Sequence, residues 1–341
     1  MSIVQQDAPP NPIRIFQTLL AFQQSAALRA AIALGLFTGI AQGHTGVAGL
    51  AKKIGASEKG TRVLCDALVI MNFLTKTGAT YGLVPESAVF LNQREPCYIG
   101  GAASFLVDDI QASGAYDDFT AAVRKGGAAF SEEGTVSRDN PIWVSFAKSM
   151  APLMAMPAQV LAARLTSEGA GPIDVLDIAA GHGLYGIAFA QKNPQAKVTA
   201  VDWDAVLQVA KENAASAGVS ARHRCLPGSA FEVNFDGPYD IVLLTNFLHH
   251  FDVPTCEGLL KRLHAATRPG ARVAVLEFVP NDDRVTPQND AFFALTMLAT
   301  TGHGDAYTHK EYDSMLRNAG FARSELTELT PLPQRIVIGY K

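Results

Sequence analysis

The stretch VLDIAAGHGLYGIA, from Val175 to Ala188, constrains the fold of this chain more than any other. Its glycines, Gly181, Gly183 and Gly186, follow a strand-like apolar run and open a helical one. Glycines at such a turn let the backbone approach a ligand closely, and the helix N-terminus that follows favours negative charge. The spacing G-x-G-x-x-G in this context predicts a loop that binds a nucleotide-containing cofactor.

The chain after Pro172 alternates strand-like and helical segments. The strand-like runs are IDVLDIA, AKVTAVD, ARHRCLPG, YDIVLLTNFL and ARVAVLEFVP. This alternation predicts an α/β fold, with a Rossmann-like parallel sheet covered by helices on both faces. The last two runs, FARSELTEL and QRIVIGYK, bring the sheet to seven strands and are close together in sequence. They fit an antiparallel hairpin at the sheet edge better than a crossover.

Residues 1–100 follow a different pattern. Apolar residues recur at helical spacing from Ile13 to about Leu36, and a short helix is expected over residues 47–54. Ser57 caps a further helix that runs to about Met71, and a hairpin then turns at Gly78. Two helices followed by a small hairpin predict a winged-helix unit.

A winged helix raises the alternative of a DNA-binding regulator that senses a small ligand. The second helix, where a recognition helix would lie, carries only Lys59 and Arg62, together with the acidic Asp66. A duplex reader needs several phosphate-neutralising cations on one face. The region is also rich in Ala and Leu. A helical dimerisation domain over residues 1–100 is therefore the favoured interpretation.

Residues 101–165 are predicted to be a helical linker, interrupted by RKGGAAFSEEGTVSRDNP. Trp143, Phe146 and Met150 lie in this segment. Such side chains are found in ordinary helix cores, and also in adaptable pockets for planar ligands. We expect the linker to contribute to a substrate pocket, and the α/β domain to occupy residues 166–341.

Composition excludes several classes of protein. The formal net charge of −4 and the absence of long runs of like charge give no indication of nucleic-acid or membrane binding. The four cysteines form no C-x-x-C pair, so neither a metal site nor a redox dithiol is expected. The N-terminus has no secretion-signal pattern, and the longest apolar stretch, AAIALGLFTGIA, is too short to cross a bilayer. A cytoplasmic protein is expected.

Two cofactors fit the glycine loop, NAD and S-adenosylmethionine. Asp202 ends the next strand and could accept hydrogen bonds from the ribose of either. Asp177, inside the first strand, favours a cofactor that carries an ammonium and a sulfonium, because it would repel a pyrophosphate. Trp203 could pack on adenine or belong to the core. A terminal hairpin is also unusual for a dehydrogenase, so S-adenosylmethionine is favoured.

The segments DIAAGHGLYG, VDW, NFLHHF and VAVLEFVP, at their spacing, resemble those of class I methyltransferases. Together with the winged-helix front, the chain resembles the small-molecule O-methyltransferases of the plant caffeate type and their bacterial relatives. This resemblance covers nearly the whole chain and is strongest from Asp174 to Pro280. It implies a homodimer, S-adenosylmethionine converted to S-adenosylhomocysteine, and a hydroxylated aromatic small molecule as methyl acceptor.

The resemblance also implies the catalytic residues. The family's base lies in an H-D-W-like stretch, seven residues before a cysteine, and counting back from Cys256 gives His249. His250 stands where the family often has Asp, and we interpret it as structural. A base of this kind needs an orienting acceptor on its other nitrogen. Glu277, at the end of the neighbouring strand, is predicted to be that acceptor.

The remaining candidate residues fall into two groups. The predicted cofactor-binding residues are Asp177, Gly181, Gly183, Asp202, Trp203, Ser229, Phe231 and Asn246. The predicted substrate-contacting residues are Trp143, Phe146, Met150, Phe292, His303 and Asp305.

The chain departs from the family pattern at two positions. Ala306 stands where the family often has a second acid, and Asp305, one residue earlier, is its possible replacement. Ser229 stands where the family has an Asp on the adenine side. Methylation at carbon or nitrogen and a nicotinamide-dependent oxidoreductase therefore remain as alternatives to O-methylation.

Overall fold

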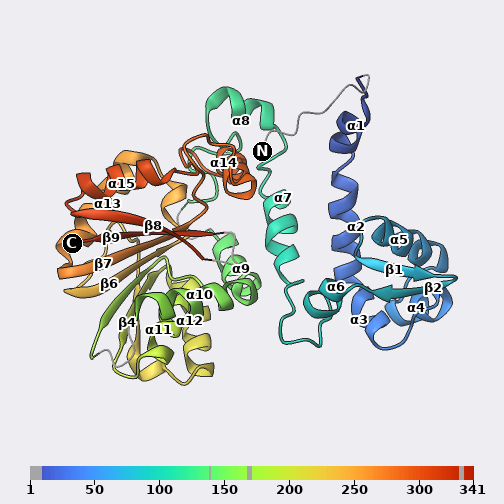
Figure 1. The fold of residues 1–341 in the computed structure, drawn as a ribbon, viewed down its shortest axis with the longest axis horizontal. Helices are drawn as coiled ribbons and strands as arrows, with labels where there is room; N and C mark the ends of the chain where they lie inside the picture. Colours follow the sequence, from blue (N-terminus) through green and yellow to red (C-terminus); the bar gives the residue numbers. More distant parts are fainter. Residues whose placement is uncertain (1–9, 138–139, 167–170, 330–333) are drawn as a thin grey trace. The chain divides into compact units, whose positions relative to one another are not determined.

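The computed structural model describes residues 10–137, 140–166, 171–329 and 334–341. The chain divides into two compact units, residues 1–103 and 104–341, and each is considered by itself (Figure 1). In the described part of the chain, no helix is both long and apolar enough to span a bilayer.

The first unit is a small helical domain with one hairpin. Strands β1 and β2 pair in antiparallel register around the predicted turn at Gly78, and the Ser57 hydroxyl caps α5 by accepting a hydrogen bond from Gly60 N at 3.1 Å. The predicted order of two helices and a hairpin is therefore present. Its elements are α1 (Ile13–Leu19), α2 (Phe22–Ala33), α3 (Leu36–Ala41), α4 (Val47–Ile54), α5 (Glu58–Ile70), β1 (Leu74–Thr77), β2 (Thr80–Leu83) and α6 (Pro85–Phe90).

The helical spacing from Ile13 to about Leu36 does correspond to helix, but not to one continuous helix. The chain forms α1 and α2 instead, separated at residues 20–21, where three backbone hydrogen bonds span three residues rather than four. Gly35 then adopts a left-handed φ of 65°, so that α3 starts in a new direction. Sequence periodicity survives such a tight turn and could not reveal it.

The second unit begins with helices that precede the sheet. They are the π-helix η1 (Ser104–Asp109), α7 (Ile110–Ala112), α8 (Phe119–Lys125), α9 (Ile142–Ser149) and α10 (Ala151–Leu165). The predicted interruption is present, because α8 ends at Gly126 in the left-handed conformation, with φ of 82°. The segment from residue 126 to 137 then packs against the end of a later helix, as described below.

A seven-stranded sheet forms the centre of the second unit, in the order β5-β4-β3-β6-β7-β9-β8 (Figure 1). The α/β fold class is thus confirmed. Strands β3 to β7 are parallel, and chain order reverses between β3 and β6. Ligands of open α/β sheets bind at such a reversal, outside the carboxyl ends of the strands. The strands are β3 (Asp174–Ile178), β4 (Lys197–Asp202), β5 (His223–Pro227), β6 (Tyr239–Thr245), β7 (Thr267–Glu277), β8 (Arg323–Glu328) and β9 (Arg335–Tyr340).

The terminal hairpin is also confirmed. Strand β9 runs antiparallel to both β7 and β8, and therefore inserts between them. Strand β8, whose residues are polar or charged apart from Leu326, forms the edge of the sheet. Polar side chains on an edge strand discourage pairing with another chain.

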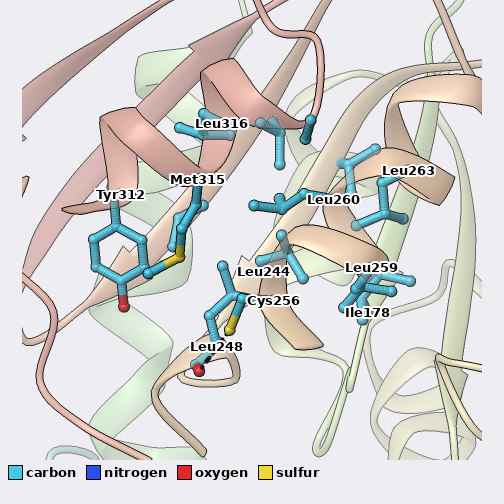
Figure 2. Packing of buried hydrophobic residues seen from close by; sticks show 14 of the residues in the cluster. Ile178, Leu244, Leu248, Cys256, Leu259, Leu260, Leu263, Tyr312, Met315 and Leu316 are labelled. Carbon is cyan, nitrogen blue, oxygen red and sulfur yellow. Dashed lines mark hydrogen bonds between the residues drawn. The ribbon is translucent and has the colours of Figure 1, made fainter. Parts of the chain in front are cut away.

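Helices cover both faces of the sheet, as the alternating pattern predicts. On one face α13 and α15 pack on β3, β6 and β7, and Leu260, Leu263, Met315 and Leu316 belong to the same buried cluster (Figure 2). On the other face α10 and α11 enclose a second cluster that includes Leu161 and Phe189. The remaining helices of this unit are α11 (Leu184–Lys192), α12 (Asp204–Ser216), η2 (Ser220–Arg222), η3 (Leu248–His250), α13 (Val253–Ala265), α14 (Gln288–Thr300) and α15 (His309–Asn318).

Candidate active site

A cavity of about 570 Å³ lies at the carboxyl ends of the central strands, where the strand order reverses. Its wall combines the loops after β3, β4, β5 and β6 with residues from α9 and from the segments 132–136 and 302–303. The lining residues include Glu132, Glu133, Val136, Trp143, Phe146, Gly181, Asp202, Trp203, Ser229, Phe231, Glu232, Asn246, Phe247, His250, Phe251, Asp252, Gly302 and His303.

The glycine loop has the backbone geometry that its sequence predicts. Gly181 and Gly183 adopt left-handed φ values of 58° and 73°. A Cβ at Gly183 would lie 2.9 Å from the Ala210 side chain, so this glycine allows α11 and α12 to pack closely. A Cβ at Gly181 would meet nothing nearer than 3.9 Å and would instead occupy the cavity. The loop is therefore a cradle whose open side is the cavity wall.

Two carboxylates hold this loop, Asp202 on the cavity wall and Asp177 behind it. Asp202 lies on the cavity wall and accepts hydrogen bonds from Gly181 N at 2.8 Å and Trp203 N at 2.7 Å. Asp177 is fully buried behind the loop; its Oδ2 accepts from Gly186 N at 3.0 Å, and its Oδ1 has no partner among the described residues. Burial raises the pKa of Asp202 to about 6 and that of Asp177 to about 7.

The other predicted cofactor residues also line the cavity. Ser229 is hydrogen-bonded through its Oγ to Phe231 N at 3.2 Å, and the Phe231 ring meets Phe251 edge-on at 4.9 Å. Asn246 adopts a left-handed φ of 54°, and its Oδ1 accepts a hydrogen bond from Gln334. Backbone strain of this kind tends to gather at functional sites. Among the predicted cofactor residues, Asp177 and Gly183 are not on the wall but behind it.

The predicted His249–Glu277 pair is formed. Glu277, the last residue of β7, is fully buried, and its Oε2 is bonded to Nδ1 of His249. Its Oε1 accepts hydrogen bonds from the backbone N–H groups of Phe247 and Leu248, at 2.9 and 3.0 Å. A carboxylate can only accept a hydrogen bond, so Nδ1 of His249 must be the donor. The neutral imidazole therefore carries its proton on Nδ1, and Nε2 keeps a lone pair.

Of the two adjacent histidines, His250 rather than His249 lines the cavity. Its ring meets Trp143 edge-on at 5.2 Å and lies 4.2 Å from the His249 ring. Its Nδ1 donates to the Phe247 carbonyl at 3.0 Å. Burial and the neighbouring His249 hold the pKa of His250 well below its usual value, so this ring is neutral at physiological pH. Its position was not predicted, because adjacent residues in a tight turn give no indication of which one faces a cavity.

The predicted substrate residues divide into two sets. Trp143, Phe146 and His303 line the cavity. Three others do not: Met150 is buried at the start of α10, Phe292 is 71% exposed, and the Asp305 carboxylate pairs with Arg284 at 3.2 Å. With Ala306 buried and apolar, neither residue supplies a second acid to the His249–Glu277 pair.

Several wall residues were missed by sequence reasoning. Glu132, Glu133 and Val136 belong to the interrupted segment before α9, which forms a β-bridge between Gly134 and Thr301. This contact is close: a Cβ at Gly134 would lie 2.1 Å from the Thr300 carbonyl oxygen. The glycines of the segment were the available signal, but no local pattern indicates which distant backbone they approach.

Comparison with known proteins establishes the family. A family model described as an O-methyltransferase domain matches residues 116–322, and an O-methyltransferase dimerisation domain matches residues 16–93. The chain belongs to the O-methyltransferase family. Members of this family use S-adenosylmethionine, so this O-methyltransferase is a methyltransferase dependent on that cofactor, and neither the oxidoreductase nor the DNA-binding alternative is retained.

Individual relatives agree with this assignment. The 8-O-methyltransferase TcmO of tetracenomycin synthesis in Streptomyces glaucescens is 27% identical, with 97% of each chain covered. A crystallised candidate O-methyltransferase from Nostoc punctiforme is 48% identical, with a TM-score of 0.94 and 98% and 100% of the two chains covered. Human N-acetylserotonin methyltransferase, solved with S-adenosylmethionine, shares the fold at 22% identity, with a TM-score of 0.83 and 99% of each chain covered.

Proposed function

We propose that this O-methyltransferase methylates a hydroxyl group of an aromatic small molecule, with His249 as general base. The buried His249–Glu277 pair beside an aromatic cavity carries this proposal. Trp143, Phe146 and Phe247 supply flat apolar walls that suit a planar acceptor. The relatives that carry an acceptor in their names point the same way, since N-acetylserotonin and tetracenomycin intermediates are aromatic.

The residues of this chain have three tasks in the reaction. Bound S-adenosylmethionine supplies a methyl group that the sulfonium charge already activates. Gly181, Asp202 and Trp203 would hold that cofactor, and the aromatic walls would orient the acceptor and exclude water. Glu277 holds the Nδ1 proton of His249, so that Nε2 can take the proton from the acceptor hydroxyl. A phenol has an ordinary pKa of about 10, which a neutral imidazole can meet when the two are well positioned.

Cofactor affinity is expected to depend on pH through Asp202. Burial raises the pKa of Asp202 to about 6, so in the absence of cofactor this carboxylate loses its negative charge in mild acid. A bound sulfonium favours the ionised carboxylate, and the dissociation constant should therefore rise about tenfold for each pH unit below 6 and level off above 7. Isothermal titration from pH 5 to 8 measures this.

The matched variants for this titration are neighbours in sequence. Asp202→Asn should bind S-adenosylmethionine more weakly at pH 8 and with a flatter pH profile. The control is Asp204→Asn, because Asp204 is 72% exposed and pairs with Lys211 outside the cavity. The raised pKa also means that ionisation of Asp202 weakens the free fold as pH rises from about 4 to 7. If the dissociation constant of Asp202→Asn depended on pH as that of the parent does, this account of Asp202 would be contradicted.

We also propose a homodimer formed through the first unit. Ile13, Ile15, Phe16, Leu19 and Phe22 on α1 and α2 are each more than half exposed, from 58% to 67%. Contiguous exposed apolar side chains mark interaction surfaces, and these lie within or next to the segment that matches the dimerisation domain.

Replacing two of these side chains is expected to separate the subunits. Phe16→Asp with Leu19→Asp would place two charges in the buried centre of the interface, so the dimer should dissociate at micromolar concentrations. Light scattering coupled to size-exclusion chromatography measures the mass. The control Gln17→Asp introduces a charge at an exposed polar position of the same helix. A double variant that keeps the mass of a dimer would place the interface elsewhere.

A further inference from the structure

The wall of the cavity is strongly one-sided in charge. Five carboxylate side chains line it, and among the residues that the structure describes no lysine or arginine does. The acidic lining residues are Glu132, Glu133, Asp202, Glu232 and Asp252. The whole chain carries a formal net charge of only −4, so the acidity of the cavity is not a reflection of the composition.

Three of these carboxylates belong to the end of the cavity next to the catalytic loop. The segment with Glu132 and Glu133 packs on Gly302, where a Cβ would lie 2.4 Å from the Glu132 carbonyl oxygen. Two residues further on, a Cβ at Gly304 would lie 2.2 Å from the His249 carbonyl oxygen. The third carboxylate, Asp252, lies two residues after His250 in the sequence. The acceptor must come to His249, and it therefore enters an acidic environment.

The charges at this end are only partly offset by their described neighbours, which are Lys125 near Glu132 and His303 near Asp252. Glu132 pairs with Lys125 at 3.3 Å, but that pair is exposed and Glu132 is 92% accessible. Hydrogen bonds from Thr255 hold the pKa of Asp252 below its usual value and keep it ionised. The buried His250 ring is neutral and adds no positive charge to the wall. Glu133 and Asp252 are therefore the carboxylates at this end that form no salt bridge with a described residue.

We infer that the O-methyltransferase selects its acceptor by charge, taking neutral or cationic hydroxylated aromatic compounds and rejecting those that carry a carboxylate, with Glu133 as a determinant. This inference rests on the proposed methylation of an aromatic hydroxyl and deepens it. Carboxylates around a pocket with apolar walls focus a negative potential that attracts cations and repels anions. An acceptor carboxylate would also lose its hydration there without gaining a described cation.

Three hydroxyindoles provide a matched test, because they share the ring hydroxyl and differ in the charge of the side chain. Serotonin is cationic, N-acetylserotonin is neutral and 5-hydroxyindole-3-acetate is anionic. Each is titrated into the S-adenosylhomocysteine complex of the full-length protein at pH 8, where histidine is ordinarily neutral, and at low salt. Methyl transfer from S-adenosylmethionine is measured in parallel. A hydroxynaphthalene series with ammonium, neutral and carboxylate substituents repeats the comparison on a second ring.

The expected result is that the anion binds at least tenfold more weakly than the cation, with the gap narrowing as salt screens it. In Glu133→Gln the gap should shrink at least threefold. Glu212→Gln, an equal loss of charge on the exposed surface of α12, should leave it unchanged.

The charge selection would be overturned by any of four results. The anion could bind as tightly as the cation or more tightly, the ratio of their dissociation constants could be unaltered in Glu133→Gln, or no compound of either series could bind. Binding and transfer together separate this inference from the proposed function. Rapid methylation of the carboxylate compounds would support the function and overturn the selection. Selective binding of cations and neutral compounds without any methyl transfer would support the selection and contradict the function.

Discussion

His249→Ala is expected to lower kcat by 10²–10⁴, the usual range for removal of a general base. The variant should fold normally, because the imidazole contributes one buried hydrogen bond and edge contacts with Phe293 and His250. It should also bind S-adenosylmethionine with an affinity within about threefold of the parent, since it leaves Gly181, Asp202 and Trp203, the residues that would hold the cofactor, unchanged. Single-turnover methyl transfer and calorimetric titration measure the two quantities separately.

Glu277→Gln is expected to have nearly the same effect on kcat. The amide oxygen can still accept from the N–H groups of Phe247 and Leu248, which keeps the loop in place. The amide NH₂ would then face His249 Nδ1, which favours the tautomer with its proton on Nε2 and removes the acceptor that the reaction requires. Because Glu277 acts through His249, the double variant should lose little more activity than His249→Ala alone.

The control for these variants is His44→Ala, on the exposed surface of the first unit. It removes an imidazole without touching the cavity and should keep full activity. Activity of His249→Ala within tenfold of the parent would exclude proton transfer by this residue and point to methylation at carbon or nitrogen. Additive losses in His249 and Glu277 variants would mean that the glutamate has a separate task.

The glycine loop was predictable from the order of strands, and the same order explains why His249 and Glu277, which the family resemblance singled out, lie together. Apolar runs placed β3, β6 and β7, and parallel strands bring their carboxyl ends to one edge of the sheet. Gly181 and His249 follow two of these strands, and Glu277 ends the third. Residues at such positions meet for topological reasons that hold whatever the detailed packing. Topology alone did not choose His249 over His250; that choice came from the resemblance to the family, and the role of His249 stays a prediction.

The acceptor side of the cavity was less predictable, because it depends on directions that sequence does not encode locally. Phe292 and Phe293 are neighbours on α14, yet the first is exposed and the second meets His249. Asp305 has its backbone N–H on the His249 carbonyl, but its carboxylate turns to Arg284. Glu133 reaches the wall through a backbone contact between segments far apart in the chain. Only tertiary packing fixes these orientations.

Gly304→Ala is expected to damage both stability and catalysis, because Gly304 lies against the loop that carries His249, the proposed base. A Cβ there would lie 2.2 Å from the His249 carbonyl oxygen and 2.6 Å from Thr301 Oγ1. Both neighbours belong to buried segments that are held by hydrogen bonds: Asp305 N donates to the His249 carbonyl at 3.0 Å, and Thr301 Oγ1 accepts from Gly304 N at 2.8 Å. The added methyl group must therefore push the two segments apart.

The size of both effects follows from this displacement. Overpacking of this kind costs about 1–3 kcal/mol, which corresponds to a Tm lower by roughly 2–4 °C per kcal/mol in a domain of this size. A shift of His249 by about 1 Å should lower kcat on the order of 10²-fold. Gly258→Ala, on α13 behind the same loop, is the matched control, because its Cβ would meet nothing within 4 Å. A helix interior gains about 0.5–1 kcal/mol from that replacement. Scanning calorimetry should therefore show a lower Tm for Gly304→Ala and a higher Tm for Gly258→Ala. Steady-state kinetics should show a lower kcat for Gly304→Ala alone. A Gly304→Ala protein with the parent's Tm and kcat would show that the loop can move freely, which contradicts its role in holding His249.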